Sequence, residues 1–484
     1  MQKSDSVSSS MIFKTMERYV MMAFQMIVQV VIARILSPSD YGIVAMMAVF
    51  IAVANVFINN GFNMALVQKK DADQEDYCTA LTINMAIGGS MYLLLVIISP
   101  LIASFYHQPL ISRYMPILGL VLVFGSVNSI QVAIANRQMK FKNLFKCNVY
   151  AGLISGIAGV VAALAGCGAW SLIIQQLVSS IVLGITLFLQ QHWVPKFMVK
   201  KSSAQSMFSF GWMMLAAALI NTIYNELNSL VIGKRYSSAD LAFYTKGSLF
   251  PKYVTTGLDG AICTVMFSAM SRKQADEKGL HDMMKKGMNI NTFLVFPCLA
   301  ILAMTGEQLT SVILTDKWLQ MVPFMQICCF TFALHPVGSV QVQALAAVGR
   351  SDLRLKMEYI KKGIGIVLLL LVLDKGPIAI ALSAAVVTIV NVVVGAIACK
   401  RVIHYNYTDT LRDILPILAI TVVTCVIMYY VNLIIIHPIV SMVITVIAGG
   451  VSYLALASIF NLYGYNYLKK NITNKLKNKI QHVM

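Results

Sequence analysis

Charged residues are scarce in this sequence. They make up 12% of its 484 residues, whereas about 25% of the residues of an ordinary soluble domain are charged. Hydrophobic residues make up 58%, and apolar runs of about 20 residues, the length that crosses the hydrocarbon core of a bilayer, recur along the whole chain. The composition therefore excludes a water-soluble globular protein and predicts an all-α integral membrane protein.

The motifs of several enzyme classes are also missing. The sequence contains no HExxH, Walker A or GxSxG motif, and no GxGxxG in a strand-turn-helix setting, so neither ATP hydrolysis nor covalent catalysis has support. The nine cysteines include no CxxC pair and fit small apolar core residues better than disulfides or a metal site. The polar N-terminal segment lacks the short apolar stretch of a signal peptide. We therefore expect that the protein is not an enzyme, uses no cofactor and has no cleaved leader.

The apolar runs predict about fourteen transmembrane helices. An even number of spans places both termini on the same side of the membrane. No outward loop exceeds about 15 residues, so we expect no soluble domain. The predicted spans lie at 14–36, 41–66, 78–104, 112–136, 143–165, 168–190, 206–232, 240–268, 284–305, 320–346, 354–373, 377–399, 411–435 and 438–463.

Basic residues outnumber acidic ones by 38 to 20, which gives a net charge of +18. Cytoplasmic loops of membrane proteins collect Lys and Arg, and the predicted spans place 30 of these residues on the side of the termini and 6 on the other side. The split predicts cytoplasmic termini and a bilayer rather than a nucleic acid as partner. The basic tail from Leu468 fits a solvated topology anchor better than an amphipathic helix on anionic lipid.

Two pairs of segments indicate an internal repeat. The segment ARILSPSDY at 33–41 and the segment GKRYSSADL at 233–241 are 200 residues apart and share the pattern Ser-x-x-Asp. This pattern suits a helix start, so two independent N-caps are the alternative. The basic connection RQMKFKNLF from Arg137 similarly resembles GRSDLRLKMEY from Gly349. A repeat of six helices predicts a substrate path at the interface of two lobes, near the middle of the membrane.

The repeat predicts two pseudo-symmetric six-helix lobes followed by two C-terminal helices and a tail. The predicted divisions are 1–204, 205–404, 405–467 and 468–484.

Three phrases of the sequence resemble a known family: ARILSPSDYGIVAMMAVF, INNGFNMALVQKKDADQEDY and IQVAIANRQMKFKNLF. They are similar to the polysaccharide transporters of the Wzx type, especially the colanic-acid-exporter-like branch, within the multidrug/oligosaccharidyl-lipid/polysaccharide exporter superfamily. The likeness is strongest over residues 1–270. It implies two lobes around a central cavity that opens alternately to either side of the bacterial cytoplasmic (inner) membrane.

The resemblance also implies a cargo and partners. The cargo would be an undecaprenyl-pyrophosphate-linked oligosaccharide, flipped from the cytoplasmic to the outer leaflet for the synthesis of surface polysaccharide or lipopolysaccharide. A glycan polymerase and glycosyltransferases would be partners of such a flippase.

The eighth predicted span carries a polar stripe. An ionisable group within a span costs at least ~2.5–3.5 kcal/mol on insertion scales, so each needs a partner, a watery cavity or a function. The stripe falls within an arc of about 80° on the helix, which predicts one wall of a cavity; pairing with neighbouring helices for structural reasons is the alternative. Its members are Thr245, Ser248, Lys252, Thr255 and Asp259.

Polar side chains also align in the first and seventh spans. Arg18, Gln25 and Gln29 lie within an arc of about 60° in the first span. Asn221 and Asn225 align in the seventh span, whereas Glu226 points about 140° away from Asn221.

Charge assigns roles to these residues. A pyrophosphate is too highly charged to cross hydrocarbon unless a cavity offers it cationic side chains. Arg18, Lys246 and Lys252 are therefore the candidates to bind it. Neutral amides suit sugars, and buried carboxylates can bind protons or sodium. The candidate sugar ligands are Gln25, Gln29, Asn221 and Asn225, and the candidate coupling groups are Glu226 and Asp259.

Two further features have open interpretations. His335 either takes part in proton movement or fills the turn at Pro336 and bonds a freed carbonyl. Lys361 and Lys362 lie three and four residues after Glu358. A helix-surface ion pair with Glu358 is the simpler interpretation of these lysines, and a cationic cytoplasmic mouth of the cavity is the alternative.

Two other functions compete with a flippase. A cation-coupled drug exporter of the same fold would favour carboxylates in its cavity, whereas the basic intramembrane residues here point the other way. A membrane enzyme, such as a polyprenyl-linked glycosyltransferase or polymerase, generally needs a sizeable outward loop, which this chain lacks.

The charge distribution yields a direct prediction of topology. In intact cells, an impermeant thiol reagent should label Lys317→Cys, which lies outside, and should not label Lys475→Cys, which lies in the cytoplasm. Labelling of position 475 would contradict the predicted orientation.

Overall fold

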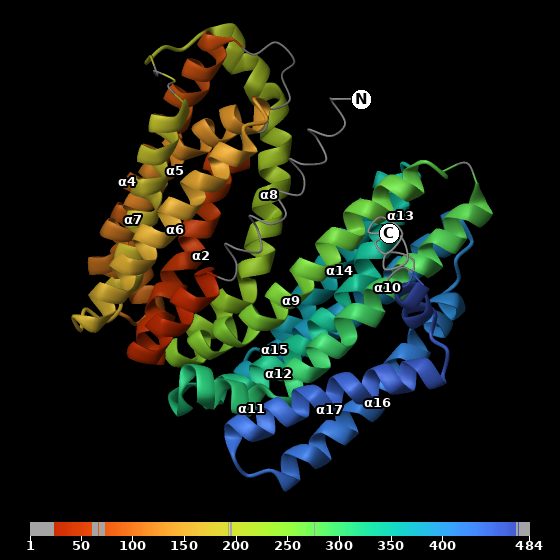
Figure 1. Ribbon diagram of the computed structural model, residues 1–484. Helices are drawn as coiled ribbons and strands as arrows, with labels where there is room; N and C mark the ends of the chain where they lie inside the picture. The colour runs from red at the N-terminus through yellow and green to blue at the C-terminus, as the bar shows by residue number, and fades with distance from the viewer. Residues whose placement is uncertain are drawn as a thin grey trace, which may run out of the picture. The chain divides into compact units, whose positions relative to one another are not determined.

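The computed structural model describes residues 24–60, 66, 73–191, 193, 196–274, 276–470 and 473, apart from four side chains. Every regular element in this part of the chain is helical (Figure 1). The chain divides into two compact units, Met1–Ala242 and Phe243–Met484. The predicted division at 204 and 404, which rests on the sequence repeat, stays a prediction.

In the described part of the first unit, six long helices follow the helix Phe24–Ile35. Within this unit α4 packs on α5, α5 and α6 pack on α7, and α2 packs on α8 (Figure 1). The helices are α2 (Pro38–Asn60), α4 (Gln74–Tyr106), α5 (Leu110–Arg137), α6 (Phe141–Leu164), α7 (Trp170–Gln191) and α8 (Lys201–Arg235).

Within the described residues, the second unit contains most of α9 (Ser238–Ser271), the helices that follow it and a short helical stretch at 463–470. Helix α10 contacts α12, α13 and α16, while α16 packs on α17 and α14 packs on α15. The helices are α10 (Glu277–Met304), α11 (Gly306–Leu309), α12 (Val322–Ala333), α13 (His335–Ala347), α14 (Ser351–Val372), α15 (Pro377–Ile403), α16 (Tyr407–Ile434) and α17 (Pro438–Ile459); a π turn at Thr310–Leu314 and a 3-10 turn at Asp316–Met321 connect α11 to α12.

The expectation of an all-α membrane protein is confirmed, and the described parts of the predicted spans are largely helical, although the span predicted at 320–346 is divided into two helices. Among the described residues, ten helical segments are long and apolar enough to cross a membrane. Helices α8, α9 and α14 are long but more polar, and they fall outside these ten. The count of fourteen spans therefore stays a prediction.

The distribution of side chains in α17 is that of a helix in lipid. Its buried residues are small or polar and recur at every fourth position, as Ser441, Thr445 and Gly449 illustrate. Large aliphatic residues such as Ile447 and Val451 are exposed. Small residues let helices approach one another closely within a bilayer, while lipid covers the large ones.

The two copies of the Ser-x-x-Asp repeat form the same cap. The Ser37 hydroxyl donates to Asp40 Oδ2 at 2.6 Å, and the Asp40 N–H donates to the Ser37 hydroxyl at 3.2 Å. The Ser237 hydroxyl likewise donates to Asp240 at 2.6 Å, and the Asp240 N–H returns a bond of 3.0 Å. Each cap thus satisfies an otherwise unpaired N–H group at the start of a helix.

The second pair of repeat segments also shares a backbone motif. Met139 and Gly349 both adopt a left-handed conformation, with φ of 54° and 76°. The next residue donates to a carbonyl five positions earlier in both turns, from Lys140 to Ala135 and from Arg350 to Leu345, each at 3.0 Å. This is the Schellman ending of a helix. The same ending also occurs at His107, Gly166 and Asn461, so the internal repeat stays a prediction.

The two capped segments meet within the first unit. The hydroxyls of Ser39 and Ser238 lie 2.9 Å apart. A Cβ atom on Gly42 would lie 1.8 Å from the Ser238 carbonyl oxygen, so only glycine permits this approach of α2 to the start of α9.

We predict that Gly42→Ala lowers the temperature of thermal unfolding, because the added methyl group must push two backbones apart. Overpacking of this kind costs about 1–3 kcal/mol. The matched control is Gly89→Ala in α4, where an added Cβ meets no atom within 4 Å. The measurement is a melting curve of detergent-solubilised protein, and equal melting of the two variants would contradict the predicted contact.

Candidate functional site

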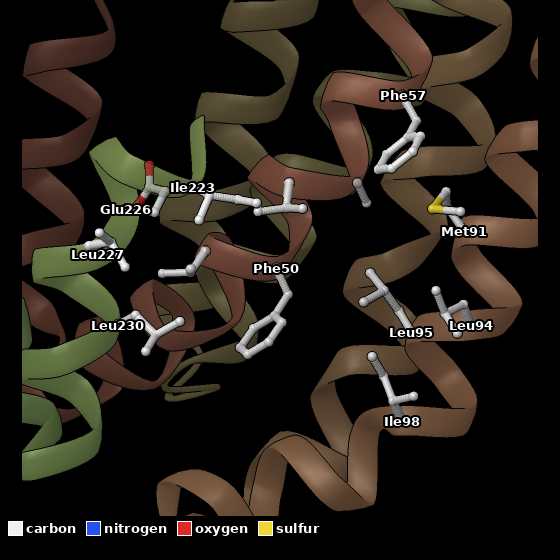
Figure 2. Close-up of a pocket in the computed structure, with 13 residues that line it drawn as sticks. Phe50, Phe57, Met91, Leu94, Leu95, Ile98, Ile223, Glu226, Leu227 and Leu230 are labelled. Atoms are coloured by element: carbon white, nitrogen blue, oxygen red, sulfur yellow. The ribbon is translucent and has the colours of Figure 1, made fainter. Parts of the chain in front are cut away.

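An apolar pocket in the first unit lies between α2, α4 and α8 and has a volume of about 320 Å³. Figure 2 shows Glu226 and Leu230 of α8 across the pocket from Met91 and Leu95 of α4. Glu226 is the ionisable residue among its lining residues. The others are Val49, Phe50, Val53, Ala54, Phe57, Met91, Leu94, Leu95, Ile98, Ile223, Leu227 and Leu230.

Helix α8 presents its candidate polar groups on different sides. Asn221 and Asn225 are exposed, while Glu226 is half-buried at the wall of the pocket. The pocket therefore contains the predicted carboxylate but neither of the two amides, and the structure does not bring these three side chains into one site.

The polar stripe of the first span is described only in part. Gln25 is exposed and Gln29 is half-buried. The backbone carbonyl of Gln29 accepts a hydrogen bond of 3.3 Å from the hydroxyl of Tyr41 in α2. Arg18 lies outside the described residues.

The second unit buries a carboxylate among four donors. Asp259 Oδ1 accepts hydrogen bonds from Asn291 of α10 at 2.5 Å, from Ser339 of α13 at 2.6 Å and from Cys263 at 3.2 Å. Asp259 Oδ2 lies 3.2 Å from His335 Nδ1. The side chain of Asp259 is 8% exposed and that of His335 is 55% exposed. The carboxylate thus has internal partners while the imidazole keeps access to the surroundings.

A break in the tenth predicted span creates this site. The segment expected as one helix at 320–346 consists of α12 and α13, which are separated at Leu334. Pro336 cannot donate a hydrogen bond to the preceding turn, and its ring clashes with that turn, so the helix ends there. His335 and Ser339 then lie in the first turns of α13, whose N-terminal dipole also favours an anion such as Asp259.

His335 thus lies at the Pro336 break and faces the carboxylate of Asp259, and its role in proton movement stays a prediction. Asn291 and Ser339 were not among the predicted site residues. The sequence does hold a weak signal for Ser339, which follows His335 by four residues and so shares its helix face.

The polar stripe of α9 does not face a single environment. Lys252 is exposed, whereas Thr255 and Asp259 are buried within the second unit. Lys246 is also buried, with 8% of its surface exposed. Helices α10 and α13 hold Asp259, and the continuous watery wall along α9 stays a prediction.

Two smaller expectations have clear outcomes. Lys362 forms an ion pair of 3.8 Å with Glu358, the helix-surface interaction expected from their spacing. All nine cysteines are free. Six of them are buried, but Cys167 and Cys298 are exposed and Cys425 is half-buried, so these three are not core residues.

A family described as polysaccharide biosynthesis protein matches residues 31–323. The chain is 22% identical over 413 residues to the teichuronic acid biosynthesis protein TuaB of Bacillus subtilis, which covers 83% of this chain and 85% of that protein. It is also 22% identical to the lipopolysaccharide biosynthesis protein WzxC of Escherichia coli, over 68% of each chain.

The fold is that of solved membrane transporters. The lipid II flippase MurJ in an inward closed conformation superposes with a TM-score of 0.74 at 16% identity, over 93% of this chain and 98% of that one. A multidrug resistance transporter of the MATE family in an inward-facing conformation gives a TM-score of 0.63 at 11% identity, over 81% and 98%. This chain therefore has the fold of multi-pass membrane transporters and belongs to the polysaccharide biosynthesis protein family.

Proposed function

We propose that the protein flips a polyprenyl-pyrophosphate-linked oligosaccharide across the bacterial cytoplasmic membrane by alternating access, with both termini in the cytoplasm. The family supports a glycan cargo. The observation that supports ion-driven movement is the pairing of buried Asp259 with His335 at the break between α12 and α13. Ion and substrate sites of secondary transporters typically lie at such discontinuous helices.

A chemical property of the carboxylate links ion binding to movement. An ionised carboxylate can accept hydrogen bonds from all four of its partners, whereas a protonated one must donate at one oxygen. Proton uptake at Asp259 would therefore require at least one of its contacts with Asn291, Ser339 or His335, which join α9 to α10 and α13, to reverse its donor direction or to break. We propose that this change releases α13 from α9 and drives one step of the transport cycle.

We propose a second role for the cations. Lys252, which is exposed on α9, binds the pyrophosphate together with Arg18 and Lys246. Lys246 is the weakest of the three candidates for pyrophosphate binding, because it is buried and a ligand could reach it only after α9 has moved. The neutral amides Gln25, Gln29, Asn221 and Asn225 are exposed or half-buried, and we propose that they contact the sugars.

The alternative function is cation-coupled drug export, because this chain shares its fold with a MATE multidrug transporter. The family match favours a glycan cargo over a drug. The colanic-acid-exporter-like branch stays a prediction, since the relatives are only 22% identical to this chain. A chromosomal neighbourhood of glycosyltransferase genes would support the glycan cargo, and its absence would favour the drug exporter.

Neutralising the buried carboxylates should impair transport. In cells that depend on this protein for surface polysaccharide, Asp259→Asn should reduce export about tenfold or more, because loss of a charge-assisted hydrogen bond costs about 1.5–3 kcal/mol and each ~1.4 kcal/mol is a factor of ten in rate. Glu226→Gln tests the carboxylate of the apolar pocket in the same assay.

The control for these variants is Asp282→Asn, which neutralises an exposed carboxylate of α10. Export is compared under an imposed proton or sodium gradient, at equal membrane abundance of each variant. Unimpaired export in the double mutant Glu226→Gln/Asp259→Asn would show that coupling does not depend on these residues.

Lys252, the exposed lysine of α9, should act through its charge. Lys252→Gln should reduce export by the value of a charge-assisted hydrogen bond, about 1.5–3 kcal/mol, and Lys252→Arg should retain more activity than Lys252→Gln. Lys356→Gln removes an exposed charge from α14 and serves as the matched control. Full export after neutralisation of Arg18, Lys246 and Lys252 together would refute the cationic pocket.

A further inference from the structure

A second pocket of about 260 Å³ lies in the second unit, where α10 ends. Segments from α10, α11, α12 and α16 surround it. Unlike the pocket beside Glu226, most of its lining residues carry hydrogen-bonding groups. The lining consists of Ala303, Met304, Glu307, Gln308, Gln326, Tyr429, Asn432 and Leu433.

The wall formed by the end of α10 is fixed by amide side chains. The last carbonyls of a helix have no partner within that helix. Here Gln326 Nε2 donates to the Ala303 carbonyl at 3.3 Å, and Asn432 Nδ2 donates to the Met304 carbonyl at 2.8 Å. These bonds hold both amides in defined orientations, so this side of the pocket is formed before any ligand arrives.

Asn432 is further oriented by α17. Its Oδ1 atom accepts hydrogen bonds from Ser441 at 2.9 Å and from Thr445 at 2.5 Å. Both hydroxyls lie on the small-residue face of α17. Both the Nδ2 and the Oδ1 atoms of Asn432 thus have hydrogen-bond partners within the protein. Its amide has a structural role and is not available to bind a ligand.

Gln308 has unused hydrogen-bonding capacity beside this wall. Its Oε1 atom is buried and accepts no hydrogen bond within the described part of the chain, and its Nε2 atom makes only a long contact of 3.5 Å with Ser441. Leaving a buried acceptor unpaired costs about 1–3 kcal/mol. A donor on a ligand would remove this cost.

Charge and shape restrict the class of ligand. The lining contains one carboxylate, Glu307, and no Lys, Arg or His, so a phosphate group would be repelled rather than bound. Glu307 and Gln308 offer oxygens that accept from hydroxyl groups, and Tyr429, which is 54% exposed, offers the face of a ring. Hydroxyl donors around a compact ring with apolar C–H faces are the features of a neutral sugar.

We propose that this pocket binds one monosaccharide residue of the glycan. Its volume lies just below the range of about 300–1,000 Å³ that drug-sized ligands occupy, which suits a single sugar ring. The adjoining turn that holds Lys317 lies on the side predicted to be external, so the pocket would meet the glycan after translocation. The identity of the sugar as cargo rests on the proposed function, but its binding does not.

The test uses the full chain in lipid nanodiscs, free of detergents with sugar headgroups. Saturation-transfer NMR measures binding of three probes, the methyl glycosides of glucose, galactose and N-acetylglucosamine. At least one should bind, and Tyr429→Ala and Gln308→Ala should each weaken it about tenfold, which equals ~1.4 kcal/mol. Tyr430→Ala is the matched control, because Tyr430 is the exposed neighbour of Tyr429 and does not line the pocket.

Three results would overturn the proposal: no glycoside binds, binding is equal in all variants, or glycerol 3-phosphate displaces the glycoside, which would indicate a lipid-headgroup site. Tyr429→Phe keeps the aromatic ring and should retain binding. It therefore serves as the control if Tyr429→Ala fails to fold. Sugar binding that depends on Tyr429, in a protein whose deletion leaves polysaccharide export intact, would support this site while refuting the proposed function.

Discussion

An unpaired polar group buried among apolar helices is costly, and hydrogen bonds between such groups join helices in both units. Asn84 donates to the Ser126 carbonyl and to the Ser129 hydroxyl, while Asn432 joins α10, α16 and α17. Asp259 joins α9, α10 and α13 in the same way, with the difference that its charge depends on proton binding. Under the proposed function, the buried hydrogen bonds of Asp259 are contacts that proton binding can change.

Much of the fold follows from local signals. Apolar runs predict the helices because a bilayer admits few other structures, and the caps at Ser37 and Ser237 mark two equivalent helix starts. The contact between Gly42 and Ser238 was not predictable, since it depends on how two helices approach. The break at Leu334 has a visible cause in Pro336, although the hydropathy of the segment is continuous across it.

The candidate site was predictable residue by residue but not as a set of partners. Lys252 and Asp259 share one face of α9, and their spacing indicates a common cavity. Packing separates them, because α10 and α13 cover Asp259 and leave Lys252 exposed. The partner of Asp259 is His335, which lies 76 positions away in the sequence, and helical periodicity carries no information on such pairs. The polar pocket around Gln308 escaped prediction for the same reason.

Movement of a lipid-linked glycan across a membrane, the proposed function, can be measured directly. The direct measurement reconstitutes the full protein in liposomes that contain a fluorescent polyprenyl-pyrophosphate-linked oligosaccharide, and follows its loss of fluorescence to an impermeant quencher added outside. If the chain flips this cargo, the inner-leaflet half of the signal decays faster with the protein than in protein-free liposomes, and Asp259→Asn slows this decay. Decay at the rate of protein-free liposomes, in a preparation shown to be folded, would contradict it.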